Sequence, residues 1–133
     1  MTDQLSPAED RLLEAMANAA RGPKRNGLFA LWLFVRQCDG RLPPDQLTDR
    51  ACRRRLELFE RRLSSLSLPA PLRRALSGSV RELRAGSLDG VAVALHQLVA
   101  PTREAMGSDA AEAIALAARK ARNVERSVQK AGV

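Results

Sequence analysis

The stretch ACRRRLELFERRLSSLSLPAPLRRALSGSVRELRAGSLDGVAVALHQLV, residues Ala51–Val99, decides the fold of this chain. Apolar residues recur in it at spacings of three and four, which place them on one side of a helix that turns every 3.6 residues. Two turn signals, SLPAP and AGS, divide the stretch into three such stripes. The sequence therefore predicts three consecutive amphipathic helices here.

The three stripes are predicted to pack together as one core. Cys52 lies on the first stripe, so we interpret it as a small core side chain in preference to a reactive thiol. Arginines and glutamates fill most other positions of these helices, which keeps one face of each helix wet. The predicted core consists of Leu56, Phe59, Leu63, Leu72, Leu76, Val80, Leu83, Leu95 and Leu98.

The turns between the stripes contain residues that interrupt helices for physical reasons. Pro69 and Pro71 lack an amide hydrogen, so each fits the first turn of the helix that follows better than a helix interior. Gly86 is predicted to end this second helix with a left-handed cap. Ser87 is predicted as the N-cap of the third helix, which Pro101 closes or kinks.

The order of these motifs carries a family resemblance. The stretch resembles the conserved domain of the steroid receptor RNA activator protein family, and it is similar to the C-terminal helical region of a COPII outer-coat scaffold protein. The resemblance covers roughly residues 49–99 and implies an antiparallel bundle of about five helices that binds other proteins and has no catalytic residues. The family's last helix has a Trp and a Gly before Lys-Arg-Leu, whereas Ala110–Ala121 is alanine-rich here. The matching motifs are Arg54-Arg55-Leu56, Leu66-Ser67-Leu68-Pro69, Glu82-Leu83, and Leu95-His96 followed by Leu98.

Capping and turn signals also mark the sequence that precedes this stretch. Ser6-Pro7 is typical of an N-cap followed by the first residue of a helix. The segment Gly22–Gly27 combines two glycines, a proline and several like charges, which predicts a loop. Asp45 or Thr48 is expected to cap the helix that carries the central arginines.

The whole chain, residues 1–133, is predicted to form a single all-α domain, an antiparallel bundle of about five helices. An aromatic share of only 3% leaves the core to leucine, alanine and valine, which favours helices over strands. Residues 1–5 and 129–133 are predicted to be disordered. The predicted helices are Pro7–Ala20, Leu28–Gln37, Gln46–Ser65, Pro71–Ala85 and Leu88–Val128, the last with a break or kink at Pro101–Ser108 and a fresh helix start at Ser108-Asp109.

The most apolar segment is GLFALWLFVRQC, residues Gly27–Cys38. Its uninterrupted apolar run, Leu28–Val35, is far shorter than the about 20 residues that span a membrane. Apolar residues occupy nearly all sides of this predicted helix, so three interpretations stay open: a central helix, a surface for a partner or a second copy, or contact with a membrane surface. The candidate interface residues are Phe29, Trp32, Leu33 and Phe34.

A net charge of +7 and a pI near 10.9 make nucleic acid the alternative partner, because arginine and lysine neutralise phosphates regardless of base sequence. No motif for reading bases is present, so such an RNA or DNA contact would be to the backbone. Ordinary solvated helix faces would explain the same arginines. The candidate nucleic-acid contacts are Arg53, Arg54, Arg61, Arg73, Arg81 and Arg84.

Catalytic and cofactor motifs are absent from the sequence. His96 is the one histidine, and we interpret it as a partly buried residue of the bundle. Neither a phosphate-binding glycine loop nor a metal-ligand spacing occurs, so no cofactor, no metal and no small-molecule substrate is predicted. Two cysteines, Cys38 and Cys52, make no disulfide framework, and no signal-peptide pattern opens the chain, which favours the cytoplasm.

These observations lead to one main functional hypothesis and one alternative. The chain is expected to be a non-catalytic helical-bundle module that binds a protein partner or itself, through the apolar helix at residues 28–35. The alternative is a basic RNA- or DNA-binding protein without sequence preference. No enzyme activity is expected.

Overall fold

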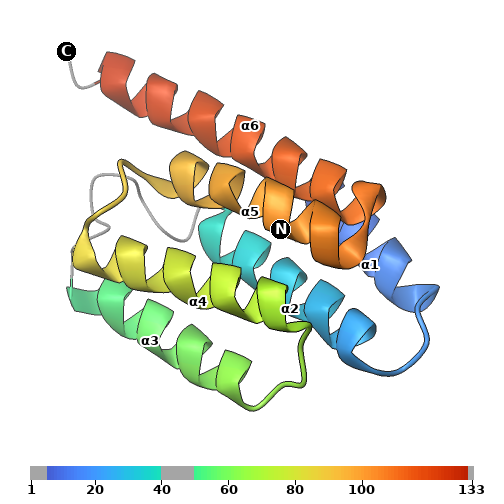
Figure 1. Cartoon of the computed structure of the whole chain (residues 1–133). Helices are drawn as coiled ribbons and strands as arrows, with labels where there is room; N and C mark the ends of the chain where they lie inside the picture. Colours follow the sequence, from blue (N-terminus) through green and yellow to red (C-terminus); the bar gives the residue numbers. More distant parts are fainter. Residues whose placement is uncertain (1–5, 40–49, 132–133) are drawn as a thin grey trace, which may run out of the picture.

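The computed structural model describes residues 6–39 and 50–131, with side chains as far as Ser127. All regular structure in these residues is helical (Figure 1), which confirms the all-α prediction with six helices in place of about five. The helices are α1 (Pro7–Ala17), α2 (Pro23–Cys38), α3 (Arg50–Ser64), α4 (Ala70–Ala85), α5 (Val91–Met106) and α6 (Ser108–Ala131).

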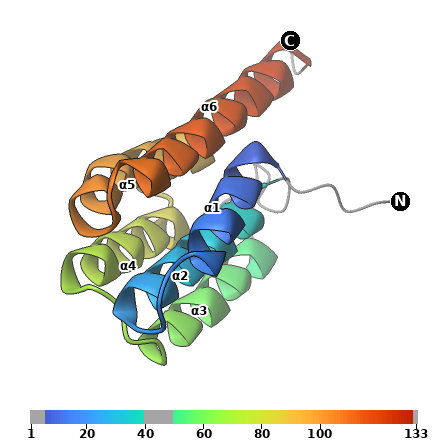
Figure 2. The ribbon, with the colours of Figure 1, turned by 90° about the vertical axis from the view of Figure 1, so that its right-hand side faces the viewer.

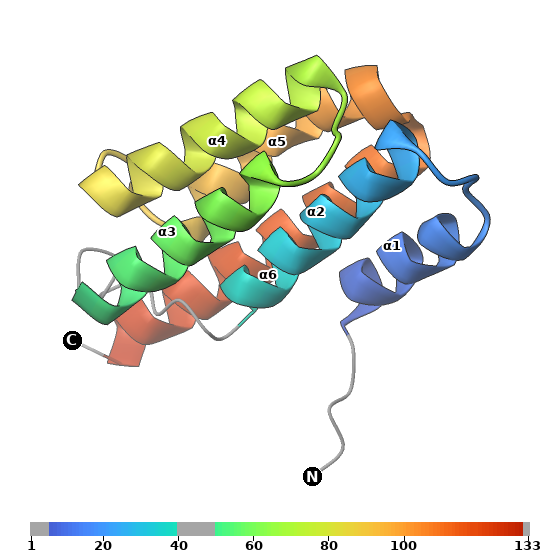
Figure 3. The ribbon, with the colours of Figure 1, turned by 90° about the horizontal axis from the view of Figure 1, so that it is seen from below.

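Helices α3 to α6 run alternately in opposite directions, each packed against the next (Figure 1). Helix α2 lies in the middle of the fold and packs against α1, α5 and α6, and its other flank faces α3 (Figures 2 and 3). All nine predicted core residues are buried in one cluster, and Cys52 is buried with them, so that prediction is confirmed. The core is therefore built as the three stripes indicate.

The start of α1 is capped as predicted and is tied to α2 by an ion pair. The Ser6 hydroxyl accepts a hydrogen bond from the Glu9 backbone N–H at 3.3 Å. The buried Glu9 carboxylate pairs with Arg36 of α2 at 3.4 Å. Burial and the neighbouring Asp39 raise the pKa of Glu9 above its ordinary value of 4.5, and Arg36 opposes them. Stability from this carboxyl therefore declines as pH rises above 4.5.

The predicted loop at Gly22–Gly27 is wrong, because α2 begins at Pro23. Proline suits the first helical position, where no amide hydrogen is needed, and Gly22 precedes it with a φ of 142°. Tertiary contacts hold this first turn in place. The Asn26 side chain donates to the Ser67 carbonyl at 3.0 Å, and Gly27 packs so closely on Leu72 that an added Cβ would lie 2.9 Å from it.

The prediction for the end of α4 is confirmed and that for the start of α5 is wrong. Gly86 adopts the left-handed conformation, with φ 74° and ψ 20°, and its N–H donates to the Leu83 carbonyl. Helix α5 begins at Val91 and not after Ser87. Its first turn takes its capping acceptor from a distant helix, because Glu125 of α6 accepts a hydrogen bond from the Ala92 N–H at 3.1 Å.

Replacing Gly90 by alanine is expected to destabilise the fold by about 1–3 kcal/mol. The φ of Gly90 is 140°, which strains any residue with a side chain, and the added Cβ would lie 2.6 Å from the Glu125 carboxylate that caps α5. Urea unfolding followed by circular dichroism measures this cost. Gly78→Ala is the matched control, since no atom lies within 4 Å of its added Cβ, and equal effects at both glycines would contradict the strain and close approach at Gly90.

The break predicted within Pro101–Ser108 is confirmed and lies at Gly107, so the last predicted segment forms two helices. Helix α5 continues through Pro101. Proline has no amide hydrogen, so the carbonyl of Gln97, four residues earlier, lacks its helical hydrogen-bond donor. Because Gln97 is exposed, water can donate to that carbonyl instead. Gly107 has a φ of 99°, which glycine adopts most easily, and α6 starts at Ser108 as predicted. The chain therefore reverses direction within one residue.

Several predictions fall on residues that the structure does not describe. The capping roles of Asp45 and Thr48, the first four residues of the predicted helix Gln46–Ser65, and the predicted disorder of residues 1–5 and 132–133 lie outside the described residues. The backbone of α6 continues to Ala131.

Candidate functional site

The outer face of α2 carries three of the four predicted interface residues. Phe29, Trp32 and Leu33 are partly exposed, whereas most apolar side chains of this helix point into the core. Phe29 and Trp32 are stacked, with ring centroids 6.1 Å apart and an interplanar angle of 22°. Helix α2 therefore buries most of its apolar side chains and leaves three of them partly exposed on its outer face.

The fourth predicted interface residue, Phe34, is placed wrongly by the sequence analysis. Its side chain is completely buried, and its ring lies 5.6 Å from that of Phe59 on α3. Helix α3 covers this side of α2, and that neighbour cannot be inferred from the periodicity of α2 alone. Phe34 is a core residue and is not available to a partner.

Two arginines lie over the exposed aromatic rings. The guanidinium carbon of Arg62, from α3, is 5.8 Å from the centre of the Phe29 ring. The guanidinium carbon of Arg36 is 5.1 Å from the centre of the Trp32 ring. These distances are typical of cation–π contacts. The contact of Arg62 with Phe29 joins the outer faces of α2 and α3 into one surface.

Helix α3 adds an exposed apolar residue to this surface. Leu58 is 51% exposed, the highest value among the large apolar side chains that the structure describes. Residues three and four positions away on a helix are its surface neighbours. For Leu58 all four are arginines, namely Arg54, Arg55, Arg61 and Arg62.

We call the set Phe29, Trp32, Leu33, Leu58 and Arg62 the α2–α3 surface, whose two helices lie side by side in Figure 3. Leu58 is absent from the predicted interface because it lies off the apolar stripe of its helix. A signal was present, since arginines occupy all four positions that lie three or four residues from Leu58. A leucine whose neighbours on the helix surface are all arginines does not face the core, so packing in the core does not explain it.

The six arginines proposed as nucleic-acid contacts do not share one role. Arg73 donates to the Leu63 carbonyl at 3.0 Å and also to the Leu66 carbonyl, so it caps the end of α3. Arg84 forms an ion pair of 2.9 Å with Glu60 and links α4 to α3. These two side chains are structural. The exposed members of the set are Arg53, Arg54, Arg61 and Arg81.

Titratable residues gather nowhere into a metal site within residues 6–39 and 50–131. His96 is exposed on α5, so its interpretation as a partly buried residue is wrong. Cys38 and Cys52 are both buried and unpaired. None of the described helices is both long and apolar enough to cross a membrane.

The fold and this surface define a class: an all-helical protein with a mixed aromatic, apolar and basic patch outside its core. Comparison of the chain with models of protein families, with curated proteins and with solved structures found no match.

Proposed function

We propose that this chain is a non-catalytic helical-bundle module that binds another protein through the α2–α3 surface. The observation that carries the proposal is the 51% exposed Leu58 on α3, one turn before Arg62, whose guanidinium lies over the partly exposed Phe29 ring of α2. Aromatic residues and arginine are the types enriched where proteins bind one another. The resemblance of residues 49–99 to a family of protein-binding domains, stated above as an expectation, agrees with this proposal.

The charges of the surface favour an acidic, amphipathic helical segment as the partner. The acidic residues Glu57 and Glu60 of α3 line a hollow on the side of α4, where Arg61 also lies and where Glu60 pairs with Arg84. The rim around Leu58 is formed by arginines. A helix with an apolar stripe for Leu58 and Phe29, flanked by carboxylates, would satisfy both features.

Nucleic acid is the weaker candidate for this surface. Single-stranded bases bind by stacking on open aromatic faces. Phe29 and Trp32 stack on one another, and each also has a guanidinium over its ring, so their faces are engaged. Leucine gains nothing from a phosphate backbone, which further favours a protein partner.

Substituting Phe29 and Leu58 together by serine is expected to weaken partner binding about tenfold or more while helix content stays unchanged. A library of displayed 16-residue peptides, selected on the natural chain, supplies the ligands, and fluorescence anisotropy measures their affinities. We expect the selected peptides to be amphipathic and acidic. Val93→Ser, at a partly exposed valine of α5 outside the surface, is the matched control.

Two further measurements test the alternative partners, a second copy of the chain and RNA. Light scattering that finds a dimer in the natural chain and a monomer in Phe29→Asp would identify the partner as a second copy. Salt-titrated binding to a random RNA should be absent at about 0.15 M salt. Binding to RNA with a steep salt slope, together with selected peptides that ignore Phe29 and Leu58, would overturn the proposal.

A further inference from the structure

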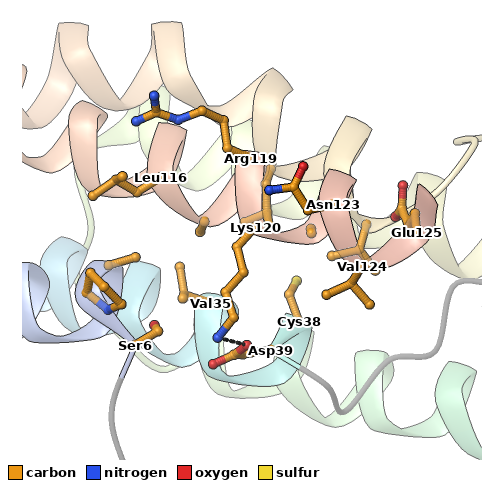
Figure 4. Close-up of a pocket in the computed structure, with 16 residues that line it drawn as sticks. Ser6, Val35, Cys38, Asp39, Leu116, Arg119, Lys120, Asn123, Val124 and Glu125 are labelled. Carbon is orange, nitrogen blue, oxygen red and sulfur yellow. Dashed lines mark ion pairs between the residues drawn. The ribbon is translucent and has the colours of Figure 1, made fainter. Parts of the chain in front are cut away.

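A pocket separate from the α2–α3 surface lies between α6 and the ends of α1, α2 and α5 (Figure 4). Its volume is about 640 Å³, within the range of ~300–1,000 Å³ that is usual for sites of small molecules. The sequence analysis gave no sign of it, because its walls come from four helices. The apolar part of these walls includes Val35, Val91, Leu95, Leu116 and Val124.

The pocket exists because α1 is short and α6 is long. Helix α1 has 11 residues and α6 has 24. Helix α1 packs beside the first half of α6, where Arg11 and Glu112 form an exposed ion pair of 3.6 Å, and Ser6 at the start of α1 already lines the pocket. Further along α6, the side chains of Ala117 and Ala121 are too small to fill the space left beside α2.

Three of the four charged residues that line the pocket have partners within the protein, and the fourth, Arg119, points away from it. Lys120 of α6 forms an ion pair of 2.7 Å with Asp39 at the end of α2 (Figure 4). The Glu125 carboxylate accepts the hydrogen bond from Ala92 that caps α5. Arg119 is exposed, and Figure 4 shows its guanidinium directed away from the space between α6 and α2.

We infer that this pocket binds an uncharged apolar molecule, such as a fatty alcohol. A charged ligand would lose hydration there, and Lys120, Asp39 and Glu125 could compensate it only by giving up their existing partners, while the Arg119 side chain points away from the space. An uncharged ligand gains free energy from burying apolar surface against Val35, Leu95 and Leu116 and leaves the Lys120–Asp39 pair intact. The site is independent of the α2–α3 surface and of the function proposed for it.

Cys38 provides a natural reporter inside the pocket. Its side chain lines the wall and is 8% exposed. Burial, with Asp39 and Glu125 adding to it, raises the pKa of this thiol, so it stays protonated at neutral pH and behaves as a small apolar group. A ligand in the pocket would cover it and slow its alkylation.

Binding of the uncharged fluorophore N-phenyl-1-naphthylamine to the natural chain tests the inference. We expect saturable binding of one molecule per chain. Ala121→Phe should weaken it about tenfold or more, because the phenyl ring occupies the pocket. Ala100→Phe, at an exposed alanine of α5 that does not line the pocket, should leave the affinity unchanged.

Competition defines the ligand class. Dodecan-1-ol should displace the fluorophore about tenfold more strongly than dodecanoate at pH 8. In a Cys52→Ala chain, dodecan-1-ol should also slow alkylation of Cys38 by N-ethylmaleimide. Absent saturable binding, or equal binding by Ala121→Phe, would overturn the pocket as a ligand site. Displacement by dodecanoate that equals or exceeds that by the alcohol would overturn the uncharged class.

Discussion

Phe34→Ala is expected to destabilise the protein by about 3–5 kcal/mol, the usual cost of removing a buried phenyl ring. The side chain is completely buried where α2 faces α3, and its contact with Phe59 at 5.6 Å adds the energy of an aromatic pair. The substitution leaves a cavity between the two helices. Since whole domains are stable by only about 5–15 kcal/mol, much of the folded population could be lost.

Phe29→Ala is the control for Phe34→Ala, because it removes a phenyl ring from the same helix at a partly exposed position. Phe29 is partly exposed on the same helix, so its loss should cost about 1 kcal/mol, through the contacts with Trp32 and Arg62. Urea unfolding of both variants measures the two costs, and Phe34→Leu extends the series if Phe34→Ala does not fold. Equal costs at positions 29 and 34 would show that Phe34 is not the buried residue of the pair.

Leu76→Ala is expected to cost about 2–5 kcal/mol. Leu76 lies in the centre of the α4 stripe with none of its side chain exposed, and it belongs to the cluster that also holds Leu56 and Leu95. Truncation removes buried methyl groups and leaves a hole that a close-packed core fills only in part. The cost should therefore exceed the simple transfer energy of the lost atoms.

Thermal and urea unfolding followed by circular dichroism test this expectation. Ala substitution at the exposed Leu58 serves as the control, since a surface leucine should change stability by about 0.5 kcal/mol or less. A cost below about 0.5 kcal/mol for Leu76→Ala would contradict its burial.

The sequence determined most of the fold because local periodicity is enough to specify which side of a helix is buried. Every residue of the predicted core is buried, and the caps at Ser6 and Gly86 are where their side-chain and backbone chemistry places them. Both kinds of signal act within a few residues of the chain. They need no knowledge of which helix packs on which.

Helix boundaries that depend on distant contacts could not be predicted in this way. Pro23–Gly27 reads as a loop on its composition, yet the Ser67 carbonyl and the Leu72 side chain hold it as a helical turn. The start of α5 depends on Glu125, more than thirty residues away. The helix propensities of single residues differ by only about 1 kcal/mol, apart from proline, so tertiary contacts worth a few kcal/mol override them.

The sequence by itself determined the fold class, the core and an excess of basic residues. Only the tertiary structure decided which surfaces are left for binding. Periodicity made α2 apolar on nearly all sides, and the position of α3 then buried Phe34 and left Phe29 outside. The pocket beside Cys38 likewise exists only where the ends of α1, α2 and α5 meet the side of α6. A binding surface is what the neighbouring elements leave uncovered, and neighbours far apart in the chain leave no mark in local spacing.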